Sequence, residues 1–329
     1  MRSSMMWRQS LLMAAMPMIE RKPLFALLLI AVLSPVPAHG AGETPAINPS
    51  RLGEKIPDDA YGAFQRGLYK TALELARERI KTGDPEAMAL AAEILSRGLG
   101  VPRNVDEAAE LYAQAAEKGV TEARFQAALL MLEGKYLTKD EARAKDYLTK
   151  AVEAGHKLAA FNLAQLIASK ARSDADRKKA YDLFLQAADA GLADAQYAVS
   201  QFLANGTGGV PFDETKAREW LEKAARQSYD TAMLDYASWL IDGIGGKKDY
   251  EAGFLWMKRA AESGNVAAQR QLARLYENGI GVKGDTVTAA AWYVVAKRAG
   301  LHDPKLDDLL DGLTEEEMKR AIETANRLK

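Results

Sequence analysis

The stretch AAQRQLARLYENGIGVKGDTVTAAAWYVVAKRAG, from Ala267 to Gly300, decides the fold of this chain of 329 residues. It holds two apolar runs at helical spacing, which the glycine turn from Gly279 to Gly281 separates. Its closing residue recurs at spacings of 36 or 37 residues, at Gly83, Gly119, Gly155, Gly191, Ser228, Gly264 and Gly300. A fixed period of this length predicts stacked copies of one unit, here a helix pair joined by a tight turn.

The first helix of each unit is marked by a column of alanines. Apolar residues follow four and eight positions later, as Leu272 and Tyr276 do in the last unit, and a small residue stands beside the first of them. This spacing gives one apolar helical face, and its small residues predict a closely packed neighbour. The column consists of Ala87, Ala123, Ala159, Ala195, Ala232 and Ala268.

The second helix of each unit carries apolar residues at i, i+3 and i+7, as Ala289, Trp292 and Ala296 do in the last unit. Trp220, Trp256 and Trp292 share the middle column, where large side chains usually fill the core. Residues able to cap a helix predict where these helices start, at Asn104, Thr138, Asp174, Asp213, Asp249 and Asp285. Because one pair cannot bury its apolar face alone, we expect the units to stack into one continuous core.

The period divides the chain into consecutive parts. Residues 58–83 are expected to form a degenerate helix pair, 84–300 six repeats, and 301–329 the capping helices. Asp303-Pro304 predicts the start of one capping helix, and a capping box from Thr314 to Glu317 predicts the start of the next. The expected repeats are 84–119, 120–155, 156–191, 192–228, 229–264 and 265–300.

The pattern A-x-x-x-L-A-x-x-Y-x-x-G-x-G-V, followed by D-x-x-x-A-x-x-W-Y-x-x-A-A-x-x-G, resembles the Sel-one-like repeat family, which is related to the tetratricopeptide repeats. The resemblance covers about residues 58 to 329. It implies an all-α fold, a right-handed α-solenoid of antiparallel helix pairs that serves as a protein-interaction scaffold. The third unit departs from the pattern, since Lys170 and Arg172 replace the turn glycines, and its turn is expected to differ.

The N-terminus has the composition of an export signal. Arg21 and Lys22 precede an apolar run from Leu24 to Leu33, and Ala38-His39-Gly40 forms a small-x-small site. We therefore expect residues 1–40 to be a signal peptide cleaved near Gly40, residues 41–57 to be a flexible linker, and the mature chain to be periplasmic. The run is about ten residues, whereas a membrane span needs roughly 20, so no stable span is expected. A retained anchor is the alternative.

The composition excludes several classes of function and of chemical site. The 44 Lys and Arg nearly balance the 45 Asp and Glu, which argues against nucleic-acid binding, and the absence of Cys excludes disulfides and thiolate sites. His156 and His302 follow closing glycines without nearby partners and are interpreted as solvated loop histidines. No serine-nucleophile or phosphate-loop motif occurs. The sequence therefore predicts no catalytic residue, no metal site and no cofactor.

One column of the first helices suggests a binding surface. Phe125, Phe161 and Tyr197 stand two residues beyond the alanine column in units two to four. By analogy with tetratricopeptide arrays, first helices line the concave groove, so these rings are candidate binding residues. Packing of the rings in the core is the alternative. The other candidate binding residues on this face are Gln165, Gln201 and Asn205.

Two functions remain open on this evidence. The first is a non-enzymatic periplasmic adaptor or regulator that holds a partner protein or peptide segment in the groove. The second is a glycan- or peptidoglycan-associated binder, whose aromatic faces would stack on sugar rings. A row of solvent-facing rings would favour the glycan, and a mixed apolar and polar groove would favour the peptide.

Overall fold

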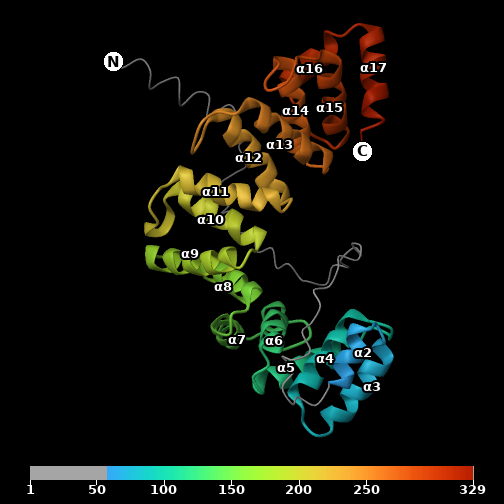
Figure 1. The fold of residues 1–329 in the computed structure, drawn as a ribbon, viewed down its shortest axis with the longest axis vertical. Helices are drawn as coiled ribbons and strands as arrows, with labels where there is room; N and C mark the ends of the chain where they lie inside the picture. The colour runs from blue at the N-terminus through green and yellow to red at the C-terminus, as the bar shows by residue number, and fades with distance from the viewer. Residues whose placement is uncertain (1–57, 329) are drawn as a thin grey trace, which may run out of the picture.

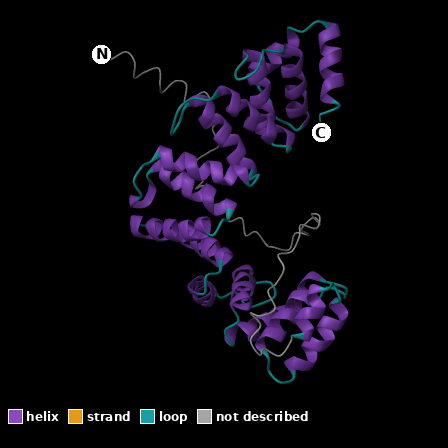
Figure 2. Ribbon diagram, viewed as in Figure 1, coloured by secondary structure: helices purple, strands orange, loops and turns teal. Residues whose placement is uncertain are grey.

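The computed structural model describes residues 58–328, which form sixteen α-helices and no strand (Figures 1 and 2). The all-α fold class is therefore confirmed. Seven helix pairs follow one another: α2 (Asp59–Gln65) and α3 (Tyr69–Ile80), α4 (Pro85–Arg97) and α5 (Val105–Glu117), α6 (Thr121–Glu133) and α7 (Glu141–Glu153), α8 (Lys157–Lys170) and α9 (Asp174–Asp189), α10 (Ala193–Asn205) and α11 (Glu214–Arg226), α12 (Asp230–Asp242) and α13 (Tyr250–Glu262), α14 (Val266–Asn278) and α15 (Thr286–Arg298). The expected signal peptide and linker lie outside the described residues.

The pairs stack in chain order into a curved, elongated array. Figure 1 shows them following one another along the long axis, with α2 near one end and α17 at the other. Helices with extensive mutual contact are neighbours in the chain, apart from α15 and α17. Such an array is an α-solenoid, in which each unit packs mainly against the units before and after it. Among the described helices, none has both the length and the hydropathy that a membrane span requires.

The first helices pack as their sequence predicts. All six alanines of the marker column are buried, and so are the apolar or small residues four and five positions later. Small side chains here let the two helix backbones of a pair approach closely, which is why the column admits only alanine.

The second helices bury one more column of equivalent positions than the sequence predicts. The residue four positions after the first inward alanine, or after Gly253 in the fifth repeat, is buried in every unit. Trp220 and Trp256, three positions after that alanine or glycine, are only half-buried. The reason is that a second helix lies between its own first helix and that of the next unit, so two adjacent columns become buried. The additional column consists of Tyr112, Leu148, Phe184, Leu221, Met257 and Tyr293.

Side chains cap the starts of all six second helices in the repeats. Four caps are the predicted residues, Asn104, Asp213, Asp249 and Asp285. The other two predictions are wrong by one or two residues. Asp140, not Thr138, accepts the backbone N–H of Arg143 at 2.9 Å. Ser173, not Asp174, caps the start of α9, and it forms a reciprocal capping box with Asp176.

The turns inside the pairs depend on glycine for space as well as for backbone conformation. Gly281 has a φ of +70°, and a Cβ added to it would lie 2.0 Å from the carbonyl oxygen of Tyr250, the first residue of α13. Gly245 makes the same close approach to Glu214 of α11, at 2.2 Å. These two turns therefore pack directly onto the backbone of the preceding unit. As expected, the turn of the third unit differs, since Ala171, the residue that follows α8, has an extended backbone conformation.

The closing residue of each unit has a positive φ throughout, including Ser228 at +63°, the one non-glycine residue with this conformation among residues 58–328. Glycine adopts this conformation without the steric penalty that a side chain brings. At Gly264 and Gly300 an added Cβ would meet nothing within 4 Å. Backbone conformation alone thus favours glycine at these two positions, whereas Gly245 and Gly281 are also confined by their neighbours.

The fully buried side chains form three clusters, and partly buried side chains bridge them, so the core continues along the array. The first runs from α2 to α8, the second from α8 to α11, and the third from α11 to the C-terminal helices. Val152, Ile167 and Leu183 pack against both the first and the second cluster, and Trp239 packs against both the second and the third. The first boundary falls in the third unit, whose turn lacks the glycines that seat other turns on the preceding unit.

Two further helices close the array, α16 (Pro304–Asp311) and α17 (Glu315–Ala325). Asp303 caps α16, and Thr314 and Glu317 form the predicted capping box of α17. Ala321 and Ala325 of α17 are buried, and α17 packs against α15. The last helix pair, α14 and α15, is therefore covered at α15.

Candidate functional site

The candidate binding residues lie on the first helices, and the structure separates them into buried and accessible groups. Phe125 is 1% exposed and Phe161 is 7% exposed, so their interpretation as groove-lining rings is wrong. Phe125 lies against the His156 ring at the start of the next first helix, with centroids 4.5 Å apart. Phe161 packs edge-on against Phe184 of its own pair. Both rings fill space between helices, which is the packing alternative.

The polar candidates are accessible. Gln165 and Gln201 are half-buried and Asn205 is exposed. The Asn205 amide donates to the backbone carbonyl of Gln201 at 2.7 Å, within α10. Their role in binding stays a prediction.

His156 is not the solvated loop histidine that the sequence suggests. Its side chain is only 16% exposed, and its Nδ1 accepts the backbone N–H of Ala159 at 3.0 Å, which caps α8. The proton is therefore on Nε2, which donates to Glu122 at 2.9 Å. That hydrogen bond lowers the pKa of the Glu122 carboxyl below its ordinary value. His302, by contrast, is exposed as expected.

Tyr197 is the member of the aromatic column that reaches the surface, and it joins two repeats. Its hydroxyl donates to the carboxylate of Asp235 on α12 at 3.0 Å. Its ring lies over that of Tyr229, the residue before α12, with centroids 5.3 Å apart. The sequence indicates Tyr197 as a candidate site residue. It does not indicate Asp235 and Tyr229, because their partner Tyr197 lies in the preceding repeat.

Burial changes the acidity of this cluster. It raises the pKa of the Asp235 carboxyl, a rise that the Tyr197 hydrogen bond opposes, and it raises the pKa of Asp194 on α10. It also raises the pKa of the Tyr197 hydroxyl, and the nearby Asp235 charge adds to that rise. No cationic side chain contributes to the shift of either carboxyl. We call Asp194, Tyr197, Tyr229 and Asp235 the tyrosine–aspartate cluster.

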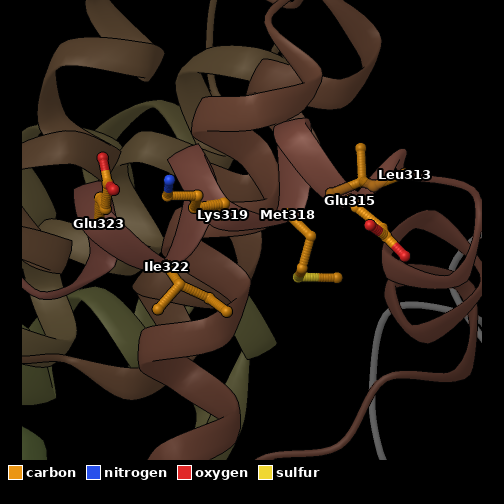
Figure 3. A pocket seen from close by; sticks show the side chains of 6 residues that line it. All are labelled: Leu313, Glu315, Met318, Lys319, Ile322 and Glu323. Carbon is orange, nitrogen blue, oxygen red and sulfur yellow. The ribbon is translucent and has the colours of Figure 1, made fainter.

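A second accessible surface lies on the terminal helix. Leu313, Met318 and Ile322 line an open hollow of about 490 Å³ on the outer side of α17, with Glu315, Lys319 and Glu323 around them (Figure 3). Ile322 is 40% exposed. Among residues 58–328, no group of three acidic or histidine side chains is arranged to hold a metal ion.

The repeat region matches a known family. The sequence profile of the Sel1 repeat matches residues 85–120, 121–156, 158–192, 193–229, 231–265 and 266–301. Two fungal proteins share a shorter stretch: chitin synthase regulatory factor 3 of Schizosaccharomyces pombe is 35% identical over 88 residues, 26% of this chain and 9% of that protein. Chitin synthase regulator SKT5 of Malassezia restricta is 36% identical over 98 residues, 29% of this chain and 7% of that protein. The chain thus spans less than a tenth of these relatives.

Two solved structures share the architecture. A protective antigen present in uropathogenic Escherichia coli strains, which displays an SLR fold, superposes with a TM-score of 0.70 at 25% identity, covering 82% of this chain and 60% of that one. A Sel1 repeat protein from Oxalobacter formigenes superposes with a TM-score of 0.62 at 24% identity, covering 74% of this chain and 98% of that one. These similarities establish the same solenoid architecture.

Proposed function

The chain belongs to the Sel1 repeat family, and from this premise we propose that it is a non-enzymatic scaffold that binds a partner protein on its first helices. The observation that carries the proposal is the surface of α10 and α12, where aromatic and polar side chains stay accessible on a stacked array. Solenoids present extended surfaces of this kind to their partners. The two fungal relatives are regulators of chitin synthase, and a regulatory role through protein binding fits a shared repeat region.

A protein partner explains the first-helix surface better than a glycan. Stacking on sugars would need a row of solvent-facing rings, but Phe125 and Phe161 are buried. What remains accessible is a mixture of half-buried rings, amides and carboxylates, which is typical of a peptide-binding surface.

Site-specific crosslinking tests the proposed function. A photoreactive phenylalanine analogue replaces Gln201 or Asn205 on α10, and matched controls carry it at the exposed Lys179 of α9 or Glu219 of α11. We expect the same partner protein to be captured from both first-helix positions and from neither second-helix position, because only the first helices present the binding surface. Mass spectrometry identifies the captured protein.

Two results would contradict this function. One is equal capture from all four positions, which would mean that first helices are not a preferred surface. The other is turnover of a substrate by the purified protein that a single substitution on this surface abolishes, which would make the chain an enzyme.

We also propose that the chain works in the periplasm after removal of residues 1–40. The support is the charged, apolar and small-residue order of the N-terminal sequence. Intact-mass measurement of the protein released from the periplasm should give a chain that starts near His39 or Ala41. Recovery of the full-length chain from the cytosol would contradict export.

A further inference from the structure

The first helices of the fourth and fifth repeats carry negative charge only. α10 contains Asp194, α12 contains Asp230, Asp235 and Asp242, and neither helix contains Lys or Arg. The second helices α9, α11 and α13 carry both signs. Every ion pair among residues 58–328 involves other carboxylates, so no cationic side chain of the described residues pairs with these four aspartates. Asp230 accepts hydrogen bonds from Asn265 at 2.8 Å and from Ser263 at 3.3 Å.

This acidic face has clear limits on both sides. The preceding first helix, α8, contains no acidic residue and has lysine only at its two ends. The following one, α14, carries Arg270 and Arg274, and Arg274 pairs with the buried Asp303 at 2.6 Å. Among the first helices of the six repeats, purely negative charge is therefore confined to α10 and α12.

Asp235 has hydrogen-bonding capacity that the protein does not use. A carboxylate offers about four acceptor positions, and the one hydrogen bond to Asp235 comes from the neutral Tyr197 hydroxyl at 3.0 Å. A partly buried charge with so little compensation is unfavourable unless a ligand compensates it. The donors that compensate a carboxylate best are lysine and arginine, whose charge strengthens the hydrogen bond.

Aromatic and apolar side chains border the same carboxylates. The Tyr197 and Tyr229 rings lie together beside Asp235, and Leu234 and Trp239 of α12 are half-buried. Aromatic faces attract lysine and arginine groups, and half-buried apolar surface favours neighbouring apolar residues of the same ligand. The carboxylates and the aromatic rings therefore both favour a ligand with lysine or arginine side chains next to apolar ones.

We propose that the face of α10 and α12 binds a basic segment of the partner protein, in which lysine or arginine side chains alternate with apolar ones. The proposal rests on the proposed function and names its recognition chemistry. One basic side chain of the segment lies over the Tyr197 and Tyr229 rings and donates to Asp235, and a second pairs with Asp194. Apolar residues of the segment cover Leu234 and Trp239.

Peptide titration tests the proposal on the mature protein. The probe is a fluorescein-labelled peptide of eight alternating lysine and leucine residues, and its controls carry glutamine or glutamate in place of lysine. We expect fluorescence anisotropy to show binding of the lysine peptide only. The Asp194→Asn, Asp235→Asn double variant should bind it about tenfold more weakly, because a charge pair at a partly buried site contributes at least that much.

The matched control removes the same charge elsewhere in the same two units. Glu219→Gln on α11 and Glu251→Gln on α13 change exposed second-helix residues, and affinity should change less than twofold. Equal losses in the two double variants would overturn the proposal, since binding would then follow net charge alone. Binding of the glutamate peptide, or of none of the three peptides, would overturn it as well.

The melting temperature of each variant shows whether weaker binding reflects a lost contact or a loss of folding. A carboxyl whose pKa is raised in the folded state favours folding below its unfolded pKa, and that contribution is lost as pH rises through the folded pKa. At pH 7 the buried charges of Asp235 and Asp194 therefore oppose folding, and the asparagine variants should melt at an equal or higher temperature. If crosslinking captures a partner on α10 while these substitutions leave its capture unchanged, the basic-segment proposal fails and the scaffold function stands.

Discussion

Replacing Phe125 and Phe161 by alanine should unfold much of the array rather than merely weaken binding. Both rings are buried between helices, and removing a buried phenylalanine destabilises a protein by about 3 to 5 kcal/mol at each site. The loss includes the contacts of Phe125 with His156 and of Phe161 with Phe184. Circular dichroism followed through thermal and urea unfolding measures the effect.

The exposed Asn205 supplies the control for this experiment. Asn205→Ala on a first helix should change stability by no more than about 0.5 kcal/mol, as is usual for surface positions. If the double alanine variant were as stable as Asn205→Ala, the two rings would not belong to the core, and their interpretation as groove residues would return.

Gly281→Ala should be the most damaging change in any turn of the array. The new methyl group would lie 2.0 Å from a backbone carbonyl oxygen of α13, and neither backbone can move without separating two repeats. Together with its positive φ, this clash should destabilise the protein by about 3 kcal/mol or more, in the range of severe steric substitutions. Hydrogen exchange should show the loss first in α14 and α15.

Gly264→Ala is the matched control, because its φ is also positive but its surroundings are open. Conformation alone should then account for a loss of about 1 to 2 kcal/mol. A Gly281→Ala variant that loses no more than Gly264→Ala would show that the turn does not rest on the preceding unit as the structure has it.

Much of the fold follows from the sequence, because its signals are local. The alanine column, four of the six second-helix caps and the capping box of Thr314 each depend on residues within one or two turns of helix. The prediction of Thr138 is wrong by two residues because Asp140 can also cap a helix and is the residue that does so. Helix register within one unit is therefore readable, within about two residues at the ends.

The features that the sequence does not predict depend on the angle at which neighbouring repeats pack. The buried column of Tyr112 and Phe184 needs a neighbour on a second side of the helix, and its place depends on the packing angle between units. The same is true of Phe125, whose ring is covered by the following repeat. Of the tyrosine–aspartate cluster, only Tyr197 was predicted. The signal for Asp194 and Asp235 is that α10 and α12 carry aspartates but no Lys or Arg, and no such signal marks Tyr229.

The place of the Tyr197–Asp235 hydrogen bond couples the shape of the array to binding. The bond joins α10 to α12, the first helices of two consecutive repeats, at 3.0 Å. A change in the angle between these repeats changes the separation of the two side chains. A ligand that contacts both side chains therefore favours one curvature of the array at this position.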